Sequence, residues 1–126
     1  MTLKFWLMLG AIVTVVFGIG LVAATNFMFT SFGVDESEAA TLMARLFGAA
    51  FIFTAVAQWG AMNSSASVPA VRGILYGAVV GNIIGAVVAT VATLNGVMNS
   101  LGWLPVALYG VWALVYIYFL FTKPAS

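Results

Sequence analysis

Residues 71–94 read VRGILYGAVVGNIIGAVVATVATL, and this stretch decides the fold that the sequence predicts. A small residue returns at every fourth position: Gly73, Gly77, Gly81, Gly85 and Ala89. Residues four apart lie nearly above one another on a helix, so this row forms a ridge without large side chains. An interior glycine costs about 1 kcal/mol relative to alanine in water, but in a bilayer the helix forms anyway and the ridge becomes a packing surface. We therefore expect a central helix that packs through its ridge.

The composition is that of a membrane protein. Hydrophobic residues make up 64% of the 126 residues and charged residues 6%, whereas a soluble domain carries about 25% charged residues. The net charge of +1 provides no basic face for nucleic acid. The chain contains no Cys and no His, which excludes disulfides, thiolate metal sites and histidine-ligated haem or zinc.

Three further apolar runs are each long enough to cross the hydrocarbon core, which needs about 20 residues. They cover residues 5–25, 39–62 and 103–122. The first run exceeds the roughly 7–15 apolar residues of a signal peptide, so we expect it to be retained. The sequence therefore predicts an all-α bundle of four transmembrane helices, with residues 1–126 forming a single integral membrane domain.

Two of these runs carry small-residue faces of their own. Gly10 and Gly18 flank Thr14 in the first run, and Ala44 and Gly48 continue from Ala40 in the second. Small residues let helix backbones approach closely in membranes. We expect both faces to pack against the glycine ridge, and a copy of the chain to be a further candidate partner for it.

The second span opens with a group of charged residues. Asp35 and Glu38 have the spacing of an N-cap and the third helical residue, so the acids are expected to cap the helix, with ion attraction or partner docking as the alternative. Arg45 lies seven residues after Glu38, on the same face. One interpretation is that Arg45 pairs with Glu38 or Asp35; the other is that it binds an anion, a lipid headgroup or a partner.

Asn82 is the polar residue near the midpoint of the third span. The prediction is a hydrogen bond across a helix interface, with the lining of a ligand or ion site as the alternative. Aromatic residues suggest where the chain meets the membrane surfaces. The Phe-rich residues 26–39 are expected to form an interfacial turn, and Trp103, Tyr116 and Tyr118 to be belt residues.

The few cations predict an orientation. Lys4, Arg72 and Lys123 lie on one side of a four-span topology, and the acidic connection lies on the other. Because cytoplasmic loops are enriched in Lys and Arg, both termini are expected in the cytoplasm.

No catalytic group is expected. The sequence shows no nucleophile paired with a base, and no carboxylate lies within a span. We therefore predict a protein that is not an enzyme, with no metal and no cofactor, although a bound lipid is compatible with the sequence. The small multidrug exporters carry a Glu in their first helix, whereas residues 5–25 contain none.

A resemblance rests on two short features. The second span contains Arg45-Leu46-Phe47-Gly48-Ala49, and the last span is rich in aromatic residues from Trp112 to Phe121. In these features the chain resembles small four-helix bacterial integral membrane proteins of uncharacterised function. The resemblance implies a four-helix bundle in a bacterial inner membrane and implies no activity.

Two functions follow as expectations. The first is a structural or accessory subunit of a larger membrane complex, whose partners are the lipid bilayer and other membrane subunits or further copies of itself. The alternative is a small homo-oligomeric channel or transporter in which Arg45 and Asn82 line a path for an anion or a polar solute.

Overall fold

The computed structural model describes residues 2–122, and every regular element among them is helical. Four helices are long and apolar enough to cross a membrane, which confirms the predicted all-α, four-helix fold. These are α1 (Leu3–Ala23), α3 (Glu38–Ala61), α4 (Pro69–Leu94) and α5 (Trp103–Phe121). A short helix, α2 (Thr25–Phe32), and a 3₁₀ turn, η1 (Ser100–Gly102), lie in the connections. Lys123, used above for orientation, lies outside the described residues.

The long helices begin at residues that suit helix starts. The Thr2 hydroxyl accepts a hydrogen bond from the Phe5 N–H at 3.2 Å and caps α1. Pro69 is the first residue of α4, where a missing N–H leaves no hydrogen bond unmade. The prediction that Asp35 and Glu38 cap the second spanning helix, α3, is wrong. Ser37 caps α3 by accepting from the Ala40 N–H at 3.0 Å, because its short hydroxyl stands directly before the first helical residue.

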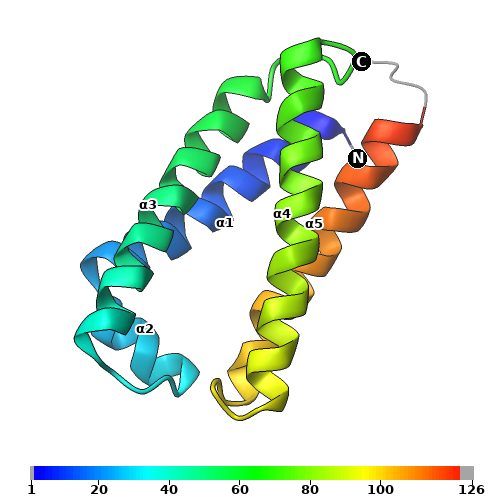
Figure 1. Ribbon diagram of the computed structural model, residues 1–126. Coiled ribbons are helices and arrows are strands. Elements are labelled where there is room, and N and C mark those ends of the chain that lie inside the picture. The colour runs from blue at the N-terminus through cyan, green and yellow to red at the C-terminus, as the bar shows by residue number, and fades with distance from the viewer. Residues whose placement is uncertain (1, 123–126) are drawn as a thin grey trace.

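The four long helices form two antiparallel pairs, as Figure 1 shows. Helix α1 packs along α3, and α4 packs along α5. The pairs approach each other where α3 leads into α4 and diverge toward the opposite end (Figure 1). The expectation that the third spanning helix lies centrally is therefore wrong, since α4 packs along its length against α5 and meets the other pair only near its N-terminal end.

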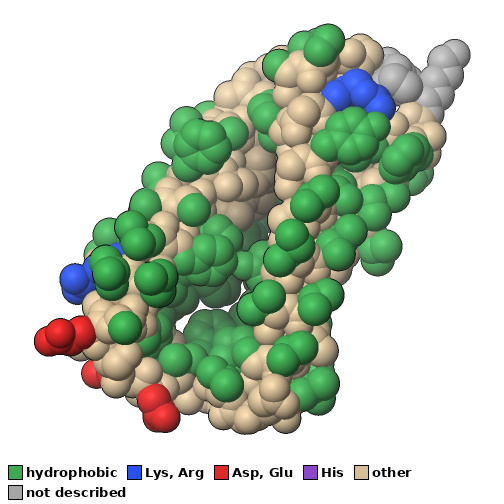
Figure 2. Space-filling view, viewed as in Figure 1, with side chains coloured by type: hydrophobic (Ala, Val, Ile, Leu, Met, Phe, Trp, Pro, Cys, Tyr) green, Lys and Arg blue, Asp and Glu red, His purple; other side chains and the backbone are tan. Residues whose placement is uncertain are grey.

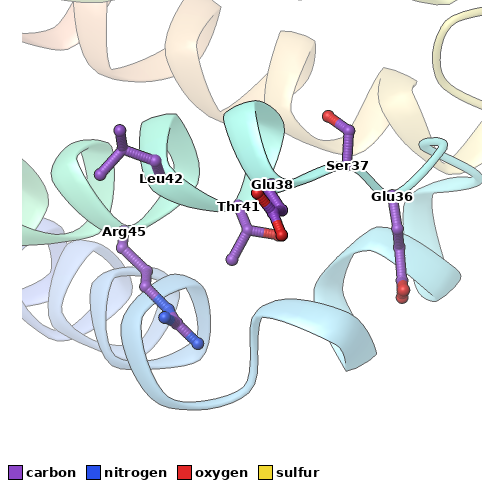
Figure 3. A pocket seen from close by; sticks show the side chains of 6 residues that line it. All are labelled: Glu36, Ser37, Glu38, Thr41, Leu42 and Arg45. Atoms are coloured by element: carbon purple, nitrogen blue, oxygen red, sulfur yellow. The ribbon is translucent and has the colours of Figure 1, made fainter.

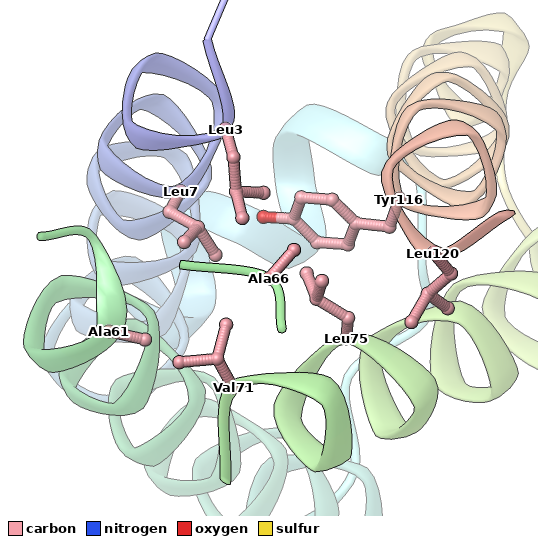
Figure 4. Close-up of a cluster of buried hydrophobic side chains, with 8 residues drawn as sticks. All are labelled: Leu3, Leu7, Ala61, Ala66, Val71, Leu75, Tyr116 and Leu120. Atoms are coloured by element: carbon pink, nitrogen blue, oxygen red, sulfur yellow. The ribbon is translucent and has the colours of Figure 1, made fainter. Parts of the chain in front are cut away.

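One hydrophobic cluster joins the two pairs at the end where they meet. Its members are Leu3, Leu7, Ala61, Ala66, Val71, Leu75, Tyr116 and Leu120, and Figure 4 shows them converging from all four long helices and the α3–α4 connection. Leu7, Leu75 and Tyr116 are the largest fully buried side chains. Tyr116 was predicted as a belt residue, and this prediction is wrong because its ring lies in this cluster and is 0% exposed.

A second junction closes the opposite end of the molecule. The Asn99 N–H donates to the Phe32 carbonyl at 2.8 Å, and its side-chain Nδ2 donates to the Ser31 carbonyl at 3.0 Å. Asn99 thus ties the C-terminus of α2 to the α4–α5 connection, and we call this contact the Asn99 clasp. Gly33 ends α2 with φ +69°, a left-handed conformation that glycine adopts without strain. The segment expected to be an interfacial turn is thus a helix followed by this turn.

Candidate functional site

The small-residue faces of the first two spans pack against each other. A Cβ atom on Gly18 would lie 2.9 Å from the Gly48 carbonyl oxygen, and one on Gly48 would lie 2.7 Å from the Gly18 carbonyl oxygen. Ala44 is buried one turn from Gly48. Gly10 is buried beside the side chains of Gln58, Trp112 and Tyr116, with no room for a Cβ atom. Gly18 and Gly48 pack as small residues do in membranes, each against the other helix and not against the ridge of α4, whereas Gly10 makes room for larger side chains.

The glycine ridge of α4 divides into two parts. At its lower end, a Cβ atom on Gly85 would lie 2.6 Å from the Tyr109 ring of α5, and Ala89 is buried. In contrast, Gly73, Gly77 and Gly81 are exposed, and apart from the adjoining backbone of α4 itself no atom lies within 4 Å of the position that a Cβ atom would occupy. The prediction that these three glycines pack against α1 and α3 is wrong, because they lie on an exposed side of α4 and not on the side that its buried residues Val71, Leu75 and Ala89 occupy.

The charged residues at the start of α3 line a shallow, open pocket of about 490 Å³. Its lining comprises Glu36, Ser37, Glu38, Thr41, Leu42 and Arg45 (Figure 3). Arg45 and Glu36 extend from opposite ends of this pocket. Arg45 is exposed, and within residues 2–122 it hydrogen-bonds to neither Glu38 nor Asp35. The structure brings Arg45 and Glu38 to one surface but does not form the predicted pair.

Asn82 is half-buried on α4. Within the described part of the chain its amide has no hydrogen-bond partner, so the predicted bond across a helix interface is not formed inside one chain. Asn82 and Arg45 belong to different helix pairs. A single chain therefore does not bring together the two residues that the channel hypothesis requires.

A polar cluster that sequence reasoning missed lies where the two pairs meet. The Tyr116 hydroxyl of α5 donates to Gln58 Oε1 of α3 at 2.7 Å, and Trp112 Nε1 donates to the Trp6 carbonyl at 3.3 Å. The rings of Trp6 and Trp112 pack edge to face with centroids 5.6 Å apart. Gln58 is 3% exposed, although its side chain is fully polar. A glutamine inside an apolar run is as costly to bury as an asparagine there. The reasoning applied to Asn82 would therefore also have singled out Gln58 from the sequence.

The polar cluster of Tyr116, Gln58, Trp112 and Trp6 lies at one end of a hollow between the helix pairs. Figure 2 shows this hollow between the two pairs, with hydrophobic side chains at its lower end. It is bounded at one end by the Tyr116–Gln58 bond and the hydrophobic cluster, and at the other by the Asn99 clasp. The acids gather at one end of the molecule (Figure 2), and at the other end Arg72, in the first turn of α4, donates to the Tyr76 hydroxyl at 3.1 Å.

Comparison with protein-family models, with curated proteins and with solved structures returned no match. Among residues 2–122, no three Asp or Glu side chains gather closely enough to hold a metal ion.

Proposed function

We propose that this protein is a non-catalytic structural or accessory subunit of a larger membrane complex, and that a transmembrane helix of a neighbouring subunit packs against Gly73, Gly77 and Gly81. The observation that carries the proposal is the open space around these three exposed glycines. Lipid chains gain little contact on a surface without side chains, whereas a second helix can bring its backbone close and pack tightly there.

The residues beside the ridge fit a crossing helix. Val80, Ile84 and Val88 each lie seven residues after a ridge glycine, so they continue the same side of α4. All three are exposed large hydrophobic residues. A neighbouring helix can approach the backbone at the glycines and diverge over the branched side chains, which is the geometry of angled contacts built on glycines four residues apart.

The channel or transporter alternative needs several copies of the chain. Arg45 lies on the outer surface of α3 and Asn82 on α4 of the other pair, so a path lined by both residues would combine side chains from different protomers. No contact within the chain favours this arrangement over the subunit role. A homo-oligomer is accordingly a distinct outcome of the experiment that tests the subunit proposal.

The test is to purify the protein from its native membrane in a gentle detergent and to determine the mass and composition of the intact assembly. We expect stoichiometric foreign subunits with the unmodified chain and their loss with Gly77→Leu, because the leucine occupies the space that the partner backbone needs. Gly110→Leu is the matched control, since Gly110 also has open space around it but lies on α5. It should retain the partners.

Two results would contradict the proposal. If Gly77→Leu retained the partners as fully as Gly110→Leu, the ridge would not be their docking surface. If the unmodified chain purified as a pure homo-oligomer, the subunit role would fail. Ion flux in liposomes, compared between the unmodified chain, Arg45→Ala and Asn82→Ala, would then test the channel.

A further inference from the structure

The hollow between the helix pairs is closed at its ends and open at its sides. Tyr116 and Gln58 join the pairs at one end, and the Asn99 clasp joins them at the other. A transmembrane helix from a partner that lay in the hollow would have to pass through both of its ends to reach the two membrane surfaces, and residues of this chain block both ends. A lipid chain ends within the bilayer and can enter from the side, so the hollow suits a lipid chain and not a helix.

The walls of the hollow carry mainly apolar and aromatic residues. Thr54, Phe51 and Phe47 lie four, seven and eleven residues before Gln58, so they continue its face along α3. The rings of Phe47 and Phe51 pack against each other at an interplanar angle of 44°, with centroids 4.3 Å apart. On α5, Trp112 and Tyr109 continue the face of Tyr116 in the same way. Such walls favour hydrocarbon over water.

Gln58 carries a side-chain donor at the end of the hollow where Tyr116 joins the two helix pairs. Its Oε1 accepts the Tyr116 hydroxyl, but Nε2 has no hydrogen-bond partner within residues 2–122. No fully buried side-chain nitrogen or oxygen in this part of the chain lacks a partner, so Nε2 must reach accessible surface even though the residue is 3% exposed. A donor left unpaired in an apolar setting is costly, and an acceptor from an occupant of the hollow would satisfy it.

The depth of Gln58 in the membrane indicates which group accepts a hydrogen bond from its Nε2. Helix α3 has 24 residues, which gives a length of about 36 Å, whereas the hydrocarbon core is about 30 Å thick. Gln58 is three residues from the end of α3 at Ala61, or about 4.5 Å along the axis. Nε2 therefore lies close to the boundary of the hydrocarbon core, where the ester groups of glycerolipids are found.

We propose that the hollow between the helix pairs binds one acyl chain of a membrane glycerolipid, and that its ester carbonyl accepts a hydrogen bond from Gln58 Nε2. The acyl chain lies between the aromatic walls of α3 and α5 and enters the hollow from the side of the protein. The proposal does not depend on the subunit role, because it rests on the hollow and on Gln58, whereas the subunit role rests on the exposed ridge glycines.

The test is a competition on the unmodified, purified protein, read by native mass spectrometry. The probes are a diester phosphatidylcholine and the diether analogue with the same chain lengths, which differ in the ester carbonyl and share a neutral headgroup. We expect one tightly retained lipid per chain and a preference of about three- to tenfold for the diester, the range that one hydrogen bond supplies. In Gln58→Leu this preference should vanish.

A second pair of variants tests the hollow without touching Gln58. Thr54 is half-buried one turn before Gln58, so Thr54→Trp should fill the hollow and displace the lipid. Val56→Trp is the matched control, because Val56 lies beside an outer groove between α1 and α3 and is largely exposed. Equal retention of the two lipids by the unmodified protein, or undiminished retention by Thr54→Trp, would overturn the proposal.

Discussion

Within residues 2–122, the hydrogen bond from Tyr116 to Gln58 is the one between two side chains that links the helix pairs, and the Trp112 bond to the Trp6 carbonyl lies beside it. The Tyr116–Gln58 bond is buried in a setting of low dielectric, where an unpaired partner is costly. Around it, Gly10 leaves room for both side chains and for the Trp112 indole, because a Cβ atom at that position would collide with all three. The absence of a single methyl group on α1 thus allows the junction to form.

Loss of this bond should destabilise the protein. Tyr116→Phe keeps the ring in the hydrophobic cluster and leaves Gln58 Oε1 unpaired, so we expect the free energy of unfolding to fall by about 1 kcal/mol. Reversible unfolding in mixed micelles measures this change. In a Gln58→Leu background the same substitution should cost much less, because the partner is already gone. Tyr118→Phe, at an exposed tyrosine, should leave stability unchanged.

Single residues were the least predictable level of this molecule. Tyr116 and Tyr118 are two positions apart near the end of one apolar run, yet one is fully buried and the other exposed. The sequence pattern gives the same signal for both, since an aromatic residue near a membrane surface can face lipid or protein. Gln58 and Ser37 were missed because their roles depend on which side chains stand opposite and on where α3 begins.

The close pairing of helices α1 and α3 depends on the absence of side chains at Gly18 and Gly48. Their backbones approach so nearly that each glycine carbonyl occupies the space of the other's Cβ atom. The ridge of α4 has the same spacing but meets no backbone at Gly73, Gly77 or Gly81. The same four-residue spacing of small residues therefore lies at a helix contact in α1 and α3 but on an exposed surface in the N-terminal part of α4.

Two alanine substitutions should distinguish the packed glycines from the exposed ones. Gly48→Ala forces α1 and α3 apart, and we expect a loss of about 1–3 kcal/mol in unfolding free energy, as overpacking costs. Gly77→Ala adds a methyl group in open space, so the isolated chain should be unchanged or gain up to about 1 kcal/mol of helix stability. Unfolding in micelles compares the two. Equal losses for both variants would show that the ridge is packed within the chain.

The positions of the long helices could be predicted from the sequence, but the helix that each one packs against could not. The four apolar runs predicted the long helices to within a few residues, because length and hydrophobicity alone decide what can span a bilayer. Small residues four apart predicted close backbone approach at Gly18 and Gly48. The same spacing carries no information about which helix approaches, so the pairing of α1 with α3 and of α4 with α5 became known only from the structure.

The whole molecule consists of two helix pairs held at their two ends. The hydrophobic cluster joins them over a broad contact at one end, whereas the other end is joined mainly through the Asn99 clasp. The two junctions are therefore unequal. The clasp rests on few contacts, so separation of the pairs should begin there.

Asn99→Ala should let the pairs separate at the α2 end. The side-chain bonds to Ser31 and Leu101 are lost, while the cluster at the other end is untouched. Spin labels on Thr30→Cys and Val97→Cys report the separation, and the chain has no native Cys to interfere. We expect a longer and broader distance distribution by electron paramagnetic resonance. Asn95→Ala, in the same connection, is the control, and an unchanged distribution in Asn99→Ala would contradict this role of the clasp.

The division into two pairs also follows the order of the chain. Helix α1 and its partner α3 come first, and α4 and its partner α5 follow after a short connection. Membrane helices insert before they associate, and a chain made from its N-terminus can pack early segments first. The first pair can therefore complete its main contacts while the second pair is still being synthesised. Assembly of the molecule then reduces to docking the two helix pairs through the hydrophobic cluster, the Tyr116–Gln58 bond and the Asn99 clasp.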